Sequence, residues 1–358
     1  MLDEHILLLP MTADYVRLAL RLGAARGHGA GEVLRGTALG GTELAAPALR
    51  ISQRDNFVVL DNLDRLLGPG WPFDVRFGPE TSGPLGHAVA SAPTVGEAME
   101  VLAHFGQSRS PRYTLRLGTP ARGRGRLEIT ETVAVTASQR LTGDEIIMQS
   151  LHNMLETLLG SEVAAARFAF RSPPPDHAER YRATFRGPVR FQSPVTCIEF
   201  PLAWLARPTP FANPHLFDAA RTALEVEHTA LRADGLLLAE VEHLLNCAAG
   251  TQPIDLATIA TALGLSTRTL ARRLRAAGTN FRTLRDTVLK RRASLLLGET
   301  DRSVESISAE LGYADPIAFN LACHRWFGMA PRAWRQGRQK RPAPPPPLNP
   351  VSGPASSG

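Results

Sequence analysis

Hydrophobic and polar positions follow two different periods in the first 207 residues of the chain. Between Tyr113 and Thr136 they alternate around the turn sequence TPARGRG, which predicts two β-strands. From Gly143 to Ser161 apolar residues recur three and four positions apart, as on one face of an amphipathic helix. The segment from Arg167 to Pro201 predicts a strand, a loop, a short helix and two further strands. The pattern therefore indicates a mixed α and β first part.

The other patterns before residue 250 are helical. One or two helices are expected in residues 1–35, and Thr94 with Glu97 three positions later has the signature of a capping box at a helix start. Two more helices are expected, over 217–231 and 236–247. A further helix is predicted by the helical spacing of four apolar residues, Phe57, Leu60, Leu63 and Leu67.

The second part of the chain differs from the first in charge. Residues 1–250 carry 24 Arg and no Lys against 27 acidic residues, a net charge of −3. Residues 251–358 carry 16 basic residues against 7 acidic ones, a net charge of +9. A basic last part on a near-neutral first part favours a polyanionic partner for the last part alone, although a solvated basic face without a partner has the same charge.

Several classes of protein and site are not indicated. No apolar run approaches the roughly 18 residues that a membrane helix needs, and the first residues do not resemble a signal peptide, so a cytoplasmic protein is expected. Cys197, Cys247 and Cys323 match neither a disulfide framework nor a metal-binding pattern. The histidines lack metal-ligand spacing and no G-x-S-x-G elbow occurs. We therefore expect no catalytic residues, no metal and no cofactor.

A block at Leu256–Gly278 predicts two short helices joined by a turn. Gly264 suits the turn and Ser266 is a natural N-cap for the second helix. Within that helix Leu270 and Leu274 are four residues apart and point to a core. Three arginines share the opposite, exposed face: Arg268, Arg272 and Arg275.

A second block, Ser303–Gly328, repeats this arrangement. Ile307, Leu311 and Gly312 follow Ile259, Leu263 and Gly264 at a constant offset of 48 residues. In the second block Asp315 is expected to cap the second helix, and Pro316 occupies the first helical position. An amphipathic helix of about five turns is predicted between the blocks. Two helix-turn-helix units on one connecting helix can enter successive major grooves of DNA.

These blocks resemble the AraC/XylS family of transcription regulators, through IATALGLSTRTLARRLRAAG and SVESISAELGYADPIAFNLACHRWFG. The closing GMAPRAWR (Gly328–Arg335) is similar to the family's terminal G-x-x-P-x-x-[FYW]-R. The first part, through GPLGHAVASAPTVGEAMEVLAHFG and GPVRFQSPVTCIEFPLAWLARP, resembles the arabinose-binding-type N-terminal domain of the ornithine-utilisation and virulence-regulator branch.

The resemblance implies an α+β sensor and dimerisation domain followed by an all-α double helix-turn-helix DNA-binding domain. The protein is then expected to be an effector-responsive regulator, usually an activator, with operator DNA, RNA polymerase, a small-molecule effector and a second copy of itself as partners and no membrane contact. The expected divisions are an N-terminal segment (1–19), the arabinose-binding-type domain (20–207), a linker helix (208–235), the DNA-binding domain (236–338) and a disordered Pro/Ser-rich tail (339–358).

The resemblance also assigns DNA-contacting positions. Leu321 stands where the family usually has arginine and Cys323 where it usually has phenylalanine, so the first unit is expected to supply most of the base contacts. In the second unit, phosphate contacts or contacts to thymine methyl groups are expected instead. The DNA-binding residues are predicted to be Arg268, Thr269, Arg272 and Arg275 in the first unit and Ile317, Asn320, His324 and Arg325 in the second.

The role of the first domain is open between three alternatives. It can be a sensor, a dimerisation and protein-interaction module without a ligand, or an enzyme, although no catalytic constellation is found. A dimer surface is expected on the helix at 217–231. If the domain is a sensor, its apolar pocket is expected to use some of five aromatic residues that can equally form the core: Trp71, Phe73, Tyr113, Phe168 and Phe200.

Overall fold

The structure is a computed structural model that describes residues 10–37, 39–40, 44, 49–118, 123–247, 255–313 and 315–339. Residues 1–9, the turn residues 119–122 and the tail from residue 340, which the sequence predicts to be disordered, lie outside the described residues. The chain divides into two compact units, Met1–Val241 with Leu265–Phe281 and Glu242–Gly264 with Arg282–Gly358.

The first unit is built around a five-stranded sheet with the strand order β3-β4-β7-β5-β6. Neighbouring strands pair antiparallel, except that β5 and β6 are parallel. All five strands fall in the two regions, 113–136 and 167–201, where the sequence predicts strands. Their bounds are β3 (Tyr113–Gly118), β4 (Arg124–Glu131), β5 (Arg167–Ala169), β6 (Val189–Arg190) and β7 (Thr196–Pro201).

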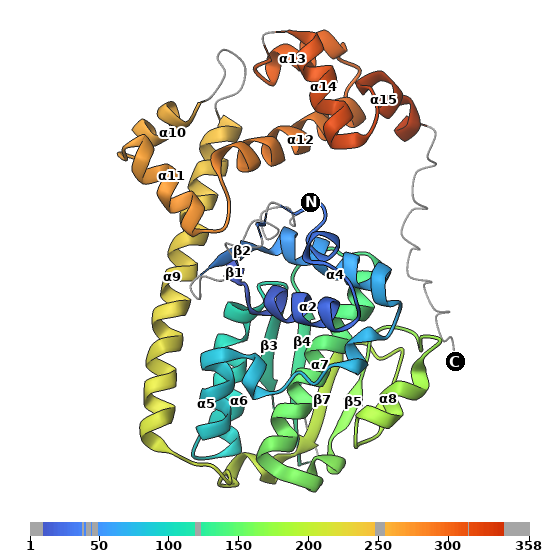
Figure 1. Ribbon diagram of the computed structural model, residues 1–358, viewed down its shortest axis with the longest axis vertical. Helices are drawn as coiled ribbons and strands as arrows, with labels where there is room; N and C mark the ends of the chain where they lie inside the picture. The colour runs from blue at the N-terminus through green and yellow to red at the C-terminus, as the bar shows by residue number, and fades with distance from the viewer. Residues whose placement is uncertain are drawn as a thin grey trace, which may run out of the picture. The chain divides into compact units, whose positions relative to one another are not determined.

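The sheet has one apolar and one charged face, because side chains alternate along each strand. Leu127 of β4 and Ile198 of β7 are directly paired and fully buried. Helices α5 (Gly83–Ser91), α6 (Val95–Arg109) and α7 (Ala137–Leu159) cover this side of the sheet (Figure 1). On the other face Arg126 lies 2.8 Å from the Glu199 carboxylate.

The predicted capping box at the start of α6 is confirmed. The Thr94 backbone N–H donates to the Glu97 carboxylate at 3.0 Å, and the Glu97 N–H donates to Thr94 Oγ1 at 3.2 Å. A second capping box, formed by Thr136 and Gln139, starts α7 six residues before the helical pattern seen in the sequence. The first two turns of α7 carry few apolar residues, which explains why the periodicity did not reveal them.

A smaller core lies beside this layer. The strands β1 (Pro10–Thr12) and β2 (Arg50–Ser52) form an antiparallel ribbon that the sequence did not predict, because three residues are too short for alternation to be visible. The expected helices are present as α2 (Asp14–Ala25), α3 (Ala30–Val33) and α4 (Gln53–Leu67). Buried side chains that join the ribbon and these helices include Met11, Val16, Ile51 and Leu63.

The two helices expected over 217–231 and 236–247 are one continuous helix, α9 (Pro214–Cys247). Gly235 lies within it and does not end it, since a single internal glycine costs only about 1 kcal/mol relative to alanine. The predicted short helix near Tyr181 is α8 (Ala178–Thr184), and 3₁₀ turns occupy Trp71–Asp74, Pro79–Thr81, Gly160–Ala165 and Leu202–Ala206.

The second unit is helical. It contains α10 (Leu256–Ala262), most of α12 (Phe281–Glu299), α13 (Val304–Glu310), α14 (Pro316–Phe327) and α15 (Pro331–Gln339). The helix α11 (Thr267–Ala276) has its contacts in the first unit. No helix of the described chain is long and apolar enough to cross a membrane. The core of the second unit is formed by Leu289, Ala293, Leu297, Ile307, Leu311, Phe319 and Cys323.

Candidate nucleic-acid interface and apolar cavity

The start of α11 is fixed by local chemistry. Gly264 adopts φ 64°, a left-handed conformation that glycine reaches without a Cβ clash. Ser266 then caps the helix, because its hydroxyl accepts the Thr269 backbone N–H at 3.1 Å. The hydroxyls of Ser266 and Thr269 also lie 2.8 Å apart. Thr269, predicted to contact DNA, is therefore part of the cap.

The two faces of α11 are separated as its periodicity predicts. Leu270 and Leu274 are fully buried, whereas Arg268, Arg272 and Arg275 are exposed. Arg275 also donates from Nε to the Ala271 carbonyl oxygen at 3.3 Å. The result is a row of guanidinium groups about one turn apart, which can present bidentate donors to guanine edges or to phosphates.

A further exposed arginine on α11 was not among the predicted contacts. Arg273 follows Arg272 directly, so it points about 100° away from the predicted row. Only its charge could have indicated a DNA contact from the sequence, because Arg273 belongs neither to the apolar side of the helix nor to the row of three arginines. It is suited to a phosphate flanking the groove.

In the second unit, α14 is capped at both ends. The Asp315 carboxylate accepts the Ile317 backbone N–H at 2.7 Å, and Gly328 at φ 72° ends the helix. Phe319 and Cys323 are fully buried against α12 and α13. The cap at Asp315 and the inward direction of Phe319 and Cys323 agree with the helix-turn-helix arrangement predicted from the sequence.

The exposed face of α14 is partly apolar. Ile317 and Leu321 are 67% and 65% exposed, and Asn320 and His324 are exposed beside them. Solvent-exposed isoleucine and leucine side chains on a recognition helix offer methyl contacts and no hydrogen bonds. This face can therefore contact thymine methyl groups, whereas Asn320 offers polar atoms for a base edge and His324 offers a ring nitrogen for a phosphate.

Arg325 is held by an ion pair. Its Nη2 lies 3.1 Å from a carboxylate oxygen of Asp286 on α12, and its guanidinium lies 5.9 Å from the centre of the Trp326 ring. Both partners of the ion pair are partly exposed, so it contributes little to stability, about 0–1 kcal/mol. A DNA phosphate can replace the carboxylate at small cost, and the pair pre-orients Arg325 at the end of α14.

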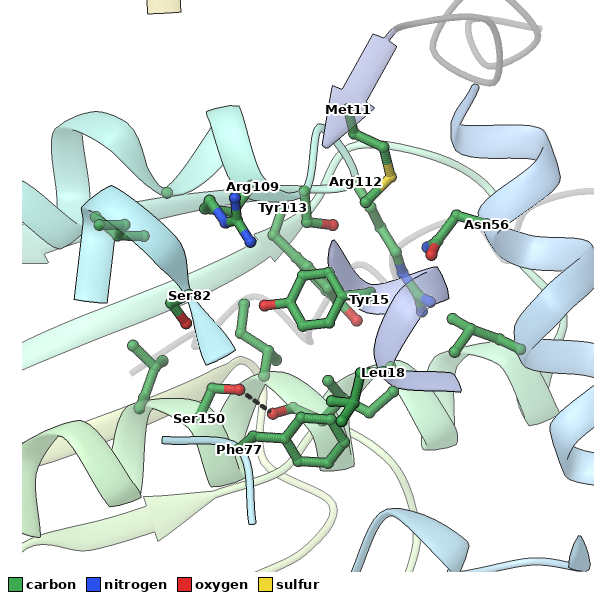
Figure 2. A pocket seen from close by; sticks show the side chains of 18 of the residues that line it. Met11, Tyr15, Leu18, Asn56, Phe77, Ser82, Arg109, Arg112, Tyr113 and Ser150 are labelled. Atoms are coloured by element: carbon green, nitrogen blue, oxygen red, sulfur yellow. Dashed lines mark hydrogen bonds between the residues drawn. The ribbon is translucent and has the colours of Figure 1, made fainter. Parts of the chain in front are cut away.

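A cavity of about 90 Å³ lies in the first unit. Its labelled side chains come from β1, α2, α4, α6, β3, α7 and the connections between them (Figure 2). Most of the lining is apolar, with Leu18, Phe77 and Met154 among the contacts. Two of the five aromatic residues proposed for a pocket line it, Trp71 and Tyr113.

The other three aromatic residues belong to the core. The centres of the Phe73 and Tyr181 rings are 4.7 Å apart, and those of the Phe168 and Phe185 rings are 4.8 Å apart. The Phe200 and Trp204 rings are stacked, with their centres 6.0 Å apart. These rings cluster with their neighbours and do not line the cavity, so for them the core alternative is the correct one.

Two buried arginines, which no pattern in the sequence marks, reach the cavity. Arg109 is 3% exposed and its Nη2 lies 2.7 Å from the Asp14 carboxylate. Arg112 is 2% exposed, and its Nε and Nη2 donate to Glu131 Oε1 at 2.9 and 2.5 Å. Burial works to raise the pKa of Asp14, but the charges of Arg109 and Arg17 outweigh it and the pKa is lowered.

The absence of a side chain at Gly143 on α7 leaves space for Arg112 and Tyr113. A Cβ at Gly143 would lie 2.3 Å from Arg112 Nη1 and 2.4 Å from the Tyr113 hydroxyl oxygen. Only glycine lets both groups approach the helix backbone this closely. Burial raises the pKa of the Tyr113 hydroxyl well above its usual value, so this hydroxyl stays protonated.

Two family profiles match the chain. Residues 27–209 match the arabinose-binding domain of AraC transcription regulators, an N-terminal domain, and residues 259–337 match a helix-turn-helix domain. The chain belongs to the AraC/XylS family of transcription regulators.

Similar proteins include other regulators. The ornithine utilization regulator of Pseudomonas aeruginosa is 30% identical over 261 residues, which cover 73% of this chain and 76% of that protein. The regulator VirS of Mycobacterium tuberculosis is 29% identical over 256 residues, 71% of this chain and 74% of that protein. The solved structure of CdpR from Pseudomonas aeruginosa covers 90% of this chain and 98% of its own, at 23% identity and a TM-score of 0.45.

In this AraC/XylS-family regulator the predicted contact residues fall on two helices. Seven of the eight are exposed, and Thr269, which is half-buried, serves the cap of α11. The helix-turn-helix profile covers both α11 and α14. The arginine row belongs to α11, while α14 presents the mixed apolar and polar face described above.

Proposed function

We propose that this regulator reads operator DNA with two helix-turn-helix units in successive major grooves and responds to a small-molecule effector held in the N-terminal domain. In this proposal it is a cytoplasmic activator that contacts RNA polymerase and binds DNA as a homodimer. The observation that carries the proposal is the row of exposed guanidinium groups at Arg268, Arg272 and Arg275, opposite two buried leucines on α11.

The two helix-turn-helix units, with recognition helices α11 and α14, have different roles in this proposal. Arg268 and Arg272 contact base edges, since a guanidinium pairs bidentately with guanine, and each good pair contributes about 1–3 kcal/mol of discrimination. That range corresponds to roughly a 5- to 150-fold preference between bases. On α14, Ile317 contacts thymine methyl groups, and His324 and Arg325 contact phosphates, because this face has few groups that can read a base edge.

Selection of binding sites from a random DNA library tests the role of Arg272. We expect Arg272→Ala to lose preference at one base pair in each site. Arg272→Lys is the matched control, because it keeps the charge but loses the planar fork of donors. It should retain non-specific affinity and still lose that preference. An unchanged base preference in both variants would contradict the assignment.

The cavity supports the sensor role, and a different observation supports a dimerisation role. Val226 and Leu236 of α9 are 67% and 68% exposed, which fits an interface between two copies along this helix. A domain can both bind an effector and dimerise. In the alternative, the domain dimerises and binds no ligand. A ligand-dependent rise in melting temperature supports the sensor, whereas dimerisation without any such ligand supports the module.

A further inference from the structure

The cavity has a composition that selects a chemical class of ligand. We propose that it binds a small carboxylate with an apolar body, whose carboxylate lies between Arg109 and Arg112; this inference rests on the proposed sensor role of the domain. The cavity of about 90 Å³ limits the ligand to a small one, since a cavity of about 150 Å³ holds a single benzene molecule. Short-chain aliphatic carboxylates and the smallest aryl carboxylates are of this kind.

The first argument is the apolar lining. Leucine, isoleucine, methionine and aromatic side chains form most of the surface, and among the described residues the lining contains no aspartate, glutamate, lysine or histidine. Gln53 and Asn56 also line the cavity and have buried side-chain atoms without a hydrogen-bond partner, so they can serve one or two polar atoms of a ligand. A neutral sugar would still place most of its hydroxyl groups against apolar side chains, at a cost for each that is left unpaired. An amino acid with a second ammonium group would have no carboxylate in this described lining to receive it. The lining therefore favours an apolar body.

The second argument is the charge beside the cavity. The Asp14 carboxylate pairs with two arginines: its Oδ1 lies 2.8 Å from Arg17 Nη1, and its Oδ2 lies 2.7 Å from Arg109 Nη2. Glu131 is shared in the same way by Arg112 at 2.5 Å and Arg140 at 2.8 Å. Each carboxylate thus serves two guanidinium groups, so neither Arg109 nor Arg112 has a carboxylate to itself among the described contacts.

Asp144 is another carboxyl group near Arg112. It accepts a hydrogen bond from the Thr196 hydroxyl at 3.1 Å, and burial raises its pKa to about 6. Its hydrogen bond goes to Thr196 and not to Arg109 or Arg112, so both guanidinium groups keep donors for a bound carboxylate.

The third argument is the set of buried polar atoms without a hydrogen-bond partner. Among the described residues these include Nε and Nη1 of Arg109, Nη1 of Arg112 and the Tyr113 hydroxyl. All three residues line the cavity (Figure 2). A buried donor without a partner is costly, and hydrogen bonds from a guanidinium to a carboxylate are among the strongest available. A carboxylate in the cavity satisfies several of these donors together.

Binding to the full-length protein tests the proposal, by calorimetry and by melting temperature. The probes are benzoate and hexanoate, their neutral amides benzamide and hexanamide, and phenyl phosphate, L-arabinose and L-ornithine. We expect at least one carboxylate to bind at least tenfold more tightly than its amide and than the other compounds. No binding by either carboxylate at millimolar concentration would overturn the proposal, as would equal binding of the amides or tighter binding of phenyl phosphate, arabinose or ornithine.

Variants locate the site. Arg109→Lys and Arg112→Lys keep the charge that pairs with Asp14 and Glu131 and should weaken carboxylate binding at least tenfold. Ser150→Met fills the cavity from α7 without changing either arginine, and should also weaken binding. Arg116→Lys, on an exposed position of β3, is the matched control and should bind as the wild type does. Unchanged binding in the first three variants would overturn the assigned site.

Operator affinity, measured with and without each compound, distinguishes a failure of the ligand class from a failure of the proposed sensor role. If a carboxylate binds at this site without changing operator affinity, the ligand class stands and the sensor role fails. If operator affinity responds only to a neutral or cationic compound, the sensor role stands and the ligand class is wrong.

Discussion

Replacing Asp144 with asparagine should stabilise the protein at neutral pH and not in acid. The carboxyl group lies on α7, is 4% exposed and accepts one hydrogen bond from Thr196. Burial raises its pKa from 3.8 to about 6, because the charged form loses its hydration in the folded protein. An asparagine of nearly the same shape keeps an acceptor for the Thr196 hydroxyl and carries no charge.

The direction in which stability changes with pH follows from proton linkage. A carboxyl group whose pKa is raised by folding binds more protons in the folded state, so the free energy of unfolding falls as pH rises from about 4 to about 6. The difference between the two pKa values corresponds to about 3 kcal/mol at 1.36 kcal/mol for each pKa unit. Asp144→Asn removes this loss, so its advantage over the wild type should grow by up to this amount between pH 4 and pH 7.

Thermal unfolding of both proteins at several pH values between 4 and 8 measures this advantage. For a domain of this size, 3 kcal/mol corresponds to roughly 6–12 °C in melting temperature. Titrating groups that do not interact with Asp144 act equally on both proteins and cancel in the difference. Asp218→Asn, at an exposed position of α9, is the matched control and should show no such trend. An Asp144→Asn advantage that does not change with pH would refute the reasoning.

Further predictions concern the two recognition helices. Arg325→Ala should weaken binding to all DNA sequences alike and reduce the slope of log affinity against log salt by about one contact, which titrations at several salt concentrations measure; selective loss at one base would contradict it. Ser266→Ala removes the cap of α11 and should lower the free energy of unfolding by about 1 kcal/mol, whereas Ser266→Asp should keep most of it. Leu274→Ala, at a fully buried position, should cost about 2–5 kcal/mol in denaturant unfolding, and a cost below about 1 kcal/mol would mean that the helix does not pack there.

The helical parts of the fold were predictable because their signals are local. The caps at Thr94, Ser266 and Asp315 each depend on residues two or three positions apart, and all three are present. The break expected between two helices was wrong at Gly235, where the surrounding residues of α9 continue the helix. Local patterns predict where a helix can end, but packing decides whether it does.

The cavity was less accessible to sequence reasoning. Trp71 and Tyr113 were proposed for a pocket because they are aromatic, but the same argument selected rings that belong to the core. Arg109 and Arg112 carry no local signal, since exposed and buried arginines look alike in a sequence. Their burial depends on Asp14 and Glu131, which come from other elements of the fold.

Genome-wide occupancy of the tagged regulator tests the central claim most directly. We predict discrete peaks upstream of genes for the wild type, and loss of these peaks in the double variant Arg268→Ala/Arg272→Ala. The double variant Arg268→Lys/Arg272→Lys keeps the charge and should lose the same peaks while still binding DNA. Peaks that persist unchanged in both variants would contradict the claim that the arginine row of α11 reads the operator.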